Sequence, residues 1–555
     1  MQWLKAGLSP SFVQLVVGQE VSCGVSSKLG IVTLLMYPKE CSDLPPGKVG
    51  LQPAIGLSAW KLPWRPFRKA WPDVRLLNRR EAIGYAAGFG AAAVLPSAAL
   101  SGTGRKLEYP ELLDATTSRR FQLIAQSGAT RFRGSSATET IGYNQGYLGP
   151  TIRLLTDADT LAEVQNTLDE PVSSHWHGLL VPGPFDGGPH QAIAPGRSWD
   201  PVLNLDQPPA TAWYHSHVHG STARQVMFGL AGVLHVTDGE DDERGLPSTY
   251  AVDDLTLVLQ DRQFNWRGRM TYDVGMHQSM NGFRGDTMLV NGQAGASAAV
   301  PKGVVRCRLV NGSNARIYRL SLADDRPLHL VATDGGFLDR PVALTRMVLA
   351  PGERVEVLID FTDGRDSVLV SDDIANSAMG GMMGSGSGGR FTVLHFAVDT
   401  TLPVRIDTLP DAMDGPLPDL SSNDIPVRRL TLDMSMGMGM MMSRSGNQFS
   451  INGAPYDQNA LNFSTKLNST ERWIVRGDMM MHPFHIHGVR FQVLSDNGRQ
   501  PRAENRGWKD TVLVAGEVEL AITFEKPAPS SAPYMYHCHI LEHEDGGMMG
   551  QFSVS

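Results

Sequence analysis

The stretch His537–His543 reads HCHILEH and stands at the end of a predicted strand. Successive side chains of a β-strand point to opposite faces of its sheet. If residues 537–539 continue the strand, Cys538 faces one side while His537 and His539 face the other. The sequence therefore predicts two chemically different sites that three consecutive residues of backbone connect.

Three more motifs carry closely spaced histidines. They read HWHG at 175–178, HSHVHG at 215–220 and HPFHIHG at 482–488, and with 537–543 they hold 11 of the 16 histidines of the chain. Histidine is the commonest metal ligand among side chains near neutral pH. Four such clusters, each at the edge of a predicted strand, indicate a centre for several metal ions rather than unrelated surface or core histidines.

The donor atoms indicate which metal is bound. Imidazole suits zinc, copper, iron and nickel alike. His482, Cys538 and His543, with Met548 five residues further on, supply two imidazoles, a thiolate and a thioether. That set is typical of a blue-copper site with a weak axial methionine, a ligand that zinc rarely recruits. A short covalent route from Cys538 to metals on the other histidines fits one-electron oxidation of a substrate coupled to multi-electron reduction of O₂.

In this order, and over residues 105–555, the four motifs resemble those of the multicopper oxidase family, most closely the laccase-like periplasmic cuprous oxidases of bacterial copper-efflux systems. The resemblance implies an all-β fold of three cupredoxin-like Greek-key β-sandwiches. It also implies four copper ions, with a trinuclear cluster between the first and third sandwich. The implied ligands are His482, Cys538, His543 and Met548 for type 1 copper, His175 and His485 for type 2 copper, and His177, His215 and His539 for one type 3 copper, with His217, His487 and His537 for the other.

Two carboxylates resemble acidic residues that serve proton transfer in this family. Asp186, within VPGPFDGGP, resembles the residue near type 2 copper, and Glu544 resembles the residue that feeds protons to the type 3 side. Reduction of O₂ to water consumes protons, so a buried site needs relays. The stretch 508–510 (WKD) also matches the family and is expected to give structural support. No role is assigned to His219, His190 and the expected buried thiol Cys307.

Methionines suggest the substrate. Six of them fall within the nine residues 434–442, interleaved with glycine, a pattern that a core strand rarely has. Met379, Met382 and Met383 lie in a Gly/Ser-rich loop, and 479–481 reads MMM just before His482. Thioethers are soft ligands suited to Cu(I). The resemblance implies Met434, Asp478 and Met480 as ligands of a substrate copper, although the family's further carboxylate in this segment has no match.

From about Arg105 the chain is predicted to consist mainly of strands. Short apolar runs such as 256–260, 304–310 and 354–360 alternate with turns, the spacing of β-sandwiches. A stretch rich in Pro, Asp and Ser indicates a linker. The predicted organisation is a leader at 1–103, domains at 104–240, 248–405 and 427–555, and the linker at 406–426.

The leader carries an export signal. Arg79–Arg80 precede an apolar run at 82–95 that is too short to span a bilayer, and small residues follow at 96–99. The arginine pair indicates the twin-arginine route to the periplasm, without the Phe-Leu that usually follows it. Because such a signal normally begins a chain, the true start is expected near Val74 or Leu76.

Composition limits the kind of partner. The net charge of -8 argues against nucleic acid, and 4 cysteines are too few for a disulfide-built scaffold. The leader carries 11 Lys and Arg against 5 Asp and Glu, so the rest of the chain has a net charge of about −14, which favours a cationic substrate.

The predicted function is oxidation of Cu(I), one electron at a time, coupled to reduction of O₂ to water, which lowers copper toxicity. A monomer without a membrane span is expected. One alternative is a laccase-type oxidase of small phenols, with the methionine-rich segment as a shield over type 1 copper. Another is copper sequestration without catalysis. A two-domain copper nitrite reductase is disfavoured, because its chain would not contain all four histidine motifs.

Overall fold

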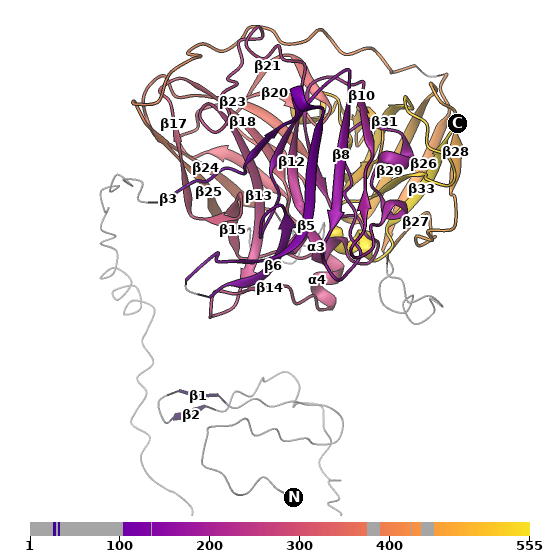
Figure 1. Cartoon of the computed structure of the whole chain (residues 1–555), viewed down its shortest axis with the longest axis horizontal. Helices are drawn as coiled ribbons and strands as arrows, with labels where there is room; N and C mark the ends of the chain where they lie inside the picture. The colour runs from indigo at the N-terminus through magenta and orange to yellow at the C-terminus, as the bar shows by residue number, and fades with distance from the viewer. Residues whose placement is uncertain are drawn as a thin grey trace, which may run out of the picture. The chain divides into compact units, whose positions relative to one another are not determined.

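The computed structural model describes residues 104–134, 136–374, 389–422, 424–434 and 449–555, together with the backbone of 26–28 and 31–33 (Figure 1). The chain divides into two units, Met1–Pro96 and Ser97–Ser555. In the first unit, β1 (Ser26–Lys28) and β2 (Ile31–Thr33) form an antiparallel pair. The export signal and its arginine pair lie outside the described residues. The second unit contains everything that follows.

Two sheets make up the first third of this second unit, and buried apolar side chains such as Leu123, Val164 and Trp176 fill the space between them. Alternation of exposed and buried residues along the strand that contains Leu123 is the pattern of a half-buried strand. One sheet has the order β10 (Val202–Leu205), β8 (Ala158–Asn166), β5 (Arg120–Thr130) and β6 (Thr138–Tyr143), with β9 (Ser198–Trp199) on β8; the other has the order β11 (Ala210–His215), β12 (Ala231–Thr237), β7 (Thr151–Leu155) and β4 (Leu112–Asp114). The helical elements of the first third are α2 (Ala115–Ser118), η1 (Gly183–Phe185), η2 (Pro189–Gln191) and α3 (Thr222–Phe228).

The second third is again a pair of sheets around its own core. The expected strands at 256–260, 304–310 and 354–360 all lie in its first sheet. That sheet has the order β16 (Gln293–Ala294), β15 (Thr287–Val290), β13 (Asp254–Phe264), β18 (Val304–Asn311), β23 (Arg354–Asp360), β20 (Leu328–Thr333) and β21 (Gly336–Leu344), with β14 (Met270–Thr271) on β13. The other has the order β22 (Met347–Leu349), β19 (Tyr318–Leu322), β24 (Ser367–Asp373), β25 (Arg390–Val398), β17 (Ala296–Val300) and β3 (Arg105–Lys106), and helix α4 is Met276–Asn281. The short strand β3 lies at the start of the predicted first domain, 104–240, but pairs with β17 of the second third.

The last third is one hydrogen-bonded sheet whose strand β29 (Thr470–Ile486) is long enough to serve two groups of partners. Its register against β31 (Thr511–Thr523) shifts between Gly477 and His482. The order is β27 (Phe449–Ile451), β26 (Val427–Met434), β29, β32 (Tyr534–Cys538), β33 (Met549–Val554) and β28 (Phe463–Thr465), with β31 joining β29 to β30 (Arg490–Asp496). The helical turns are η3 (Ala503–Asn505) and α6 (Leu541–Asp545). The predicted all-β class is therefore confirmed.

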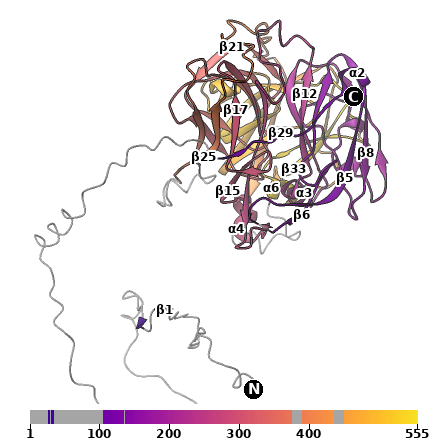
Figure 2. The same ribbon diagram turned by 60° about the vertical axis from the view of Figure 1, so that its left-hand side comes forward.

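Short helices from all three thirds meet at one edge of the body. Figure 2 shows α3, α4 and α6 near its lower edge, and both α3 and α4 contact α6. Ala223 and Val226 of α3 share a small apolar cluster with Leu541 of α6. Within the described residues, no helix has the length and apolar character needed to cross a membrane.

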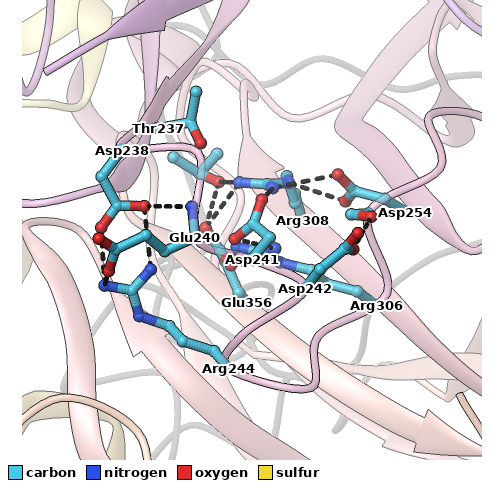
Figure 3. A network of polar contacts seen from close by, with 12 residues as sticks. Thr237, Asp238, Glu240, Asp241, Asp242, Arg244, Asp254, Arg306, Arg308 and Glu356 are labelled. Atoms are coloured by element: carbon cyan, nitrogen blue, oxygen red, sulfur yellow. Dashed lines mark hydrogen bonds and ion pairs between the residues drawn. The ribbon is translucent and has the colours of Figure 1, made fainter.

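A buried network of charges joins the first two thirds (Figure 3). Arg306 and Arg308 on β18 share the carboxylate of Glu356 on β23, and Arg308 also binds Asp254 at 2.7 Å. The hydroxyl of Thr211, on β11 of the first third, donates to Glu356 at 2.6 Å. Burial would raise the pKa of Glu356, but Arg306 and Arg308 hold it below its usual range. The network therefore carries ionised groups with matched partners.

A neighbouring arginine anchors the predicted linker. Arg244 binds Asp238 with two nitrogens and Asp414 with its Nε at 2.9 Å. Asp414 lies within 406–426, so this segment is held against the loop that leaves the first third. The exact boundaries expected for the linker and the three domains stay predictions.

Candidate metal centres

Three buried side chains that can bind a metal converge in the last third of the chain. They come from β29 (His482), the end of β32 (Cys538) and α6 (His543), and none is exposed to solvent. The Cys538 sulfur lies 3.4 Å from Nδ1 of His482 and 3.6 Å from Nδ1 of His543. Met548 is equally buried and belongs to the same apolar core cluster as Cys538. Its backbone carbonyl accepts the backbone N–H of Cys538. We call these four residues the Cys538 site.

The surroundings of the Cys538 site hold its two imidazoles in a metal-binding form. The Nε2–H of His543 donates to the carbonyl of Met280 in α4 at 3.2 Å, which leaves Nδ1 free. The backbone N–H of Ile540 points at the Cys538 sulfur at 3.4 Å. Burial lowers the pKa of His482 to about 4 and raises the pKa of the Cys538 thiol. The imidazole is therefore neutral, the form in which histidine binds metals.

Eight further histidines form a second, fully buried group, which we call the histidine cluster. Four come from the first third of the chain and four from the last, so the cluster lies where these two parts meet. Several rings face each other through Nε2 atoms, at 3.1 to 3.4 Å. The members are His175, His177, His215, His217, His485, His487, His537 and His539.

Most of the implied ligand sets are brought together. His217, His487 and His537 form one group of ligand atoms within 4.8 Å of one another, and His175 lies 3.4 Å from His485 between their Nε2 atoms. In the third set, His177 and His215 group with His175. The ring of His539 lies 5.1 Å from that of His177 and 5.4 Å from that of His215 between centroids, close to the 5.2 Å between His487 and His537 in the set with His217.

Hydrogen bonds to carbonyl groups decide which nitrogen of each ring carries its proton. A carbonyl oxygen can only accept. The Nδ1 atoms of His175 and His485 therefore donate to the carbonyls of Asp186 and Asp510, at 3.0 and 2.9 Å. His537 donates in the same way to the carbonyl of Cys538 at 3.1 Å. In each ring the Nε2 atom is left as a bare acceptor that points into the cluster.

The convergence of these acceptors favours a bound cation. The Nε2 atoms of His175 and His485 lie 3.4 Å apart, and two neutral rings that carry their proton on Nδ1 cannot donate to each other there. His487 binds the Asp186 carboxylate through Nδ1 at 2.7 Å, and its Nε2 faces that of His537 at 3.1 Å. Burial lowers the pKa of His537 and His487 well below the usual range, so neither ring supplies a second proton. Buried, unpaired acceptors are costly, and metal ions would satisfy them.

Other nitrogens of the cluster are buried without any hydrogen-bond partner among the described residues. They include Nδ1 of His177 and Nε2 of His215. His177 differs from the other rings because its Nε2 is taken by the Asp510 carboxylate at 3.0 Å, which leaves Nδ1 to face inward. The chemistry of the donor set thus fits several bound metal ions of a type that imidazole and thiolate prefer.

Each of the two predicted carboxylates lies close to Nδ1 of two rings of the cluster. Asp186 accepts from Nδ1 of His487, and its side chain also lies 3.5 Å from Nδ1 of His175. The two oxygens of Glu544 lie 3.4 Å from Nδ1 of His217 and 3.3 Å from Nδ1 of His537. Both side chains are buried. Burial, followed by the charge of neighbouring Asp545, raises the pKa of Glu544 well above its usual range.

A buried arginine that the motifs did not reveal supports the same cluster. Arg354, in β23 of the second third, binds both carboxylate oxygens of Asp510 at 2.7 and 2.6 Å. Asp510 in turn orients His177 through its carboxylate and His485 through its carbonyl. Burial would raise the pKa of Asp510, but Arg354 and His177 lower it well below its usual range. The expectation that 508–510 supports the site is consistent with these contacts, whereas Arg354 lies too far away in sequence to be recognised.

The methionine predictions fall mainly outside the described part of the chain. Residues 435–442, the loop with Met379, Met382 and Met383, and the side chain of Asp478 are not described. Met480 is buried, and Met434 packs against the core of the last third. Their assignment as ligands of a substrate copper stays a prediction.

The residues left without a role lie apart from both metal sites. His219 is exposed and contacts the ring of Tyr456, and His190 bonds to Gln551 at 2.9 Å. Cys307 is a buried free thiol, as expected.

Comparison with known proteins finds three family models that match this chain, and relatives that are named for cell division. Models described as multicopper oxidase match residues 430–555, 125–241 and 253–381. Cell division protein FtsP of Xenorhabdus nematophila is 38% identical over 455 residues, which is 81% of this chain and 92% of that protein. FtsP of Escherichia coli K12 is 36% identical over 484 residues, 86% of this chain and 99% of that protein.

Solved structures of oxidases are also similar. A laccase-like multicopper oxidase of Ochrobactrum sp., with oxidase activity towards lignin model compounds, is 40% identical with a TM-score of 0.75, covering 81% of this chain and 100% of that one. A multicopper oxidase of Campylobacter jejuni, described as a metallo-oxidase, is 28% identical with a TM-score of 0.70, covering 81% and 95%. These matches and the three family models agree with the predicted three cupredoxin-like domains.

The predicted function is wrong. Relatives that match over nearly their whole length are named for cell division, and none of those names mentions oxidation of Cu(I), oxidation of phenols or sequestration of copper. The methionine-rich segments indicated soft ligands, which is a statement about metal affinity and not about the role of the protein in the cell. Copper detoxification is therefore withdrawn as its function.

Asp510→Asn should weaken metal binding by the histidine cluster, because the amide loses the charge that Arg354 and the ring of His177 require. We expect metal affinity to fall about 10- to 100-fold, seen as metal retained per chain after dialysis against a graded chelator. Glu471→Gln is the matched control, since Glu471 is another buried carboxylate of the last third and is bound to an arginine, Arg428. Equal retention in the two variants would contradict a supporting role for Asp510.

Proposed function

The chain belongs to the multicopper oxidase family, and from that premise we propose that it is a copper-dependent oxidoreductase with O₂ as electron acceptor. The observation that carries the proposal is the position of Cys538 between His537 and His539, with a thiolate site on one side and the histidine cluster on the other. Bound copper would supply one-electron redox chemistry, taking single electrons from a donor and delivering them to O₂.

We assign four copper ions to the residues described above. The four residues of the Cys538 site, Met548 among them, would hold type 1 copper, and His175 with His485 would hold type 2 copper. The remaining six histidines would hold the two type 3 coppers. Support comes from the bare acceptor nitrogens that converge in the cluster. The two type 3 sets would be His177, His215 and His539, and His217, His487 and His537.

Asp186 and Glu544 would act as the catalytic carboxylates. Each lies against Nδ1 of two cluster histidines and can hold a proton within reach of the cluster. The hydrogen bond from His487 to Asp186 also keeps Nδ1 of that ring protonated and thereby directs its Nε2 inward. These residues would therefore both orient the ligands and supply protons for the reduction of O₂ to water.

We further propose that the protein acts as a monomer in the periplasm after export by the twin-arginine route. Support comes from Arg79–Arg80 and the short apolar run at 82–95. Copper enzymes suit that route because it carries proteins that are already folded around their cofactors.

Cys538→Ser tests the proposal in the purified protein, because serine cannot provide the thiolate of type 1 copper. We expect about one copper per chain fewer, loss of the intense visible absorption of copper–thiolate bonds, and O₂ consumption with the dye ABTS reduced to the level of a protein-free control. Cys307→Ser is the matched control, since Cys307 is the other buried cysteine of the described body. Unchanged copper content and O₂ consumption in Cys538→Ser would contradict the proposal.

A second candidate function is a part in cell division, which the names of the FtsP relatives favour. In a strain that lacks the gene, we then expect longer cells, and the wild-type and Cys307→Ser proteins should restore normal length. If the oxidase activity serves division, Cys538→Ser should fail to restore it. Full restoration by Cys538→Ser would show that division does not use the redox chemistry, and normal length without the gene would remove the second candidate.

A further inference from the structure

An exposed tryptophan stands at the tip of a hairpin on the second third of the chain. The hairpin joins β13 and β14 through residues 265–269, and 87% of Trp266 is accessible to solvent. Val274 and Met276 follow within ten residues and are 39% and 69% exposed. Figure 1 places β14 and α4 at the same lower edge of the body. Large apolar side chains therefore gather on one short segment of surface.

The hairpin tip is rigidly built. The side chain of Asn265 accepts the backbone N–H groups of Arg267 and Arg269, at 3.0 and 3.1 Å, and its backbone bonds to Gly268 and Arg269. Below the tip, Phe264 packs on Phe132, which contacts Tyr147 edge to face. The preorganised turn thus keeps Trp266 exposed to solvent, and its apolar ring stays unburied.

The neighbouring loop at 131–134 lies directly against this turn. A side chain at Gly268 would meet the carbonyl of Arg133 at 2.5 Å, and the φ of Gly268 is +78°, so glycine allows the close approach. Arg133 also bonds to Thr287 at 3.0 Å, which fixes its position. A shallow hollow between the two loops is lined by Arg133, Phe264, Asn265, Trp266 and Arg267.

Four exposed arginines lie on this turn and on the neighbouring loop, and we call them with Trp266 the Trp266 tip. None of the ion pairs found among the described residues involves any of the four. Arg267 lies over the Trp266 ring at 4.5 Å and Arg133 over Phe264 at 5.9 Å. The arginines are Arg131, Arg133, Arg267 and Arg269. The body as a whole is acidic, so this positive tip is a local exception to the charge of the chain.

We propose that the Trp266 tip docks the protein on an anionic phospholipid membrane. Tryptophan is favoured at the level of lipid headgroups because its ring is apolar with one polar edge. Arginines that form no ion pair with the described residues attract anionic headgroups, and the hollow beside Trp266 can receive one. A projecting rigid tip fits a soft, flat surface. Such binding is peripheral, and it would turn α4, which contacts the Cys538 site through Met280, toward the membrane.

The test uses the purified full chain with vesicles of phosphatidylcholine and phosphatidylglycerol in equal parts, compared with vesicles of phosphatidylcholine alone. We expect sedimentation with the anionic vesicles only, and weaker binding as salt is raised. Arg267→Glu with Arg269→Glu should lower the affinity about tenfold or more. The matched control is Arg340→Glu with Arg365→Glu, two exposed arginines of the same third of the chain, which should bind as wild type.

A second measurement depends on the ring itself and not on charge. Brominated anionic lipids should quench part of the tryptophan emission of the wild-type protein, and Trp266→Phe should remove that quenching while leaving the fold unchanged by circular dichroism. Failure of the wild type to bind anionic vesicles would overturn the proposal. So would wild-type affinity in the Arg267→Glu, Arg269→Glu variant, or capture of an acidic protein by the tip in the absence of vesicle binding.

Membrane docking is independent of the proposed redox function. The Cys538→Ser variant and the metal-free protein should bind vesicles with wild-type affinity, since Trp266 and its arginines touch neither metal site. Loss of oxidase activity with intact vesicle binding, or the reverse, therefore shows which of the two proposals has failed.

Discussion

Strands β29 and β32 pair in an antiparallel register that places Phe484 opposite Cys538 and His485 opposite His537. Residues that face each other across such a ladder share one side of the sheet. A slip by one residue would exchange the two sides and would bring Cys538 into the histidine cluster. The separation of the Cys538 site from the cluster, and their connection through one peptide unit on either side, both follow from this register.

The same register needs support from elsewhere in the chain, because β29 and β32, with His487 and His539 directly after them, supply only four of the eight cluster rings. The first third brings the other four rings, and the second third brings Arg354, which holds Asp510 with two charge-assisted hydrogen bonds. Removing one partner from such a buried pair typically costs about 3 to 5 kcal/mol. Asp510 is therefore a point at which all three parts of the chain are tied together around the rings of His177 and His485.

The sequence predicted most of what depends on short spacing. Alternation along a strand places Cys538 on the opposite side from His537 and His539, and the HPFHIHG motif indicates the other strand of the pair. Arg354 could not be found in this way, since it is an ordinary strand arginine 156 residues from Asp510. The same is true of Met280, whose carbonyl fixes the ring of His543. Such contacts depend on how distant segments pack.

The error about function has a different origin. Methionine content and the copper motifs describe which metals a chain can bind, whereas the purpose of that chemistry depends on partners outside the chain. A fold serves several functions in different relatives, and here relatives named FtsP and relatives named laccase share the same domains. The local residues determined the chemistry of the site and left the cellular role open.

The central claim is that the Cys538 site and the histidine cluster form one redox unit. The most direct test is an anaerobic titration of the copper-loaded protein with a one-electron reductant, followed by visible absorption and electron paramagnetic resonance. The account predicts that each chain accepts four electrons, with the thiolate absorption and the cluster signals disappearing in one connected process. Uptake of a single electron per chain, with the cluster unchanged, would contradict it.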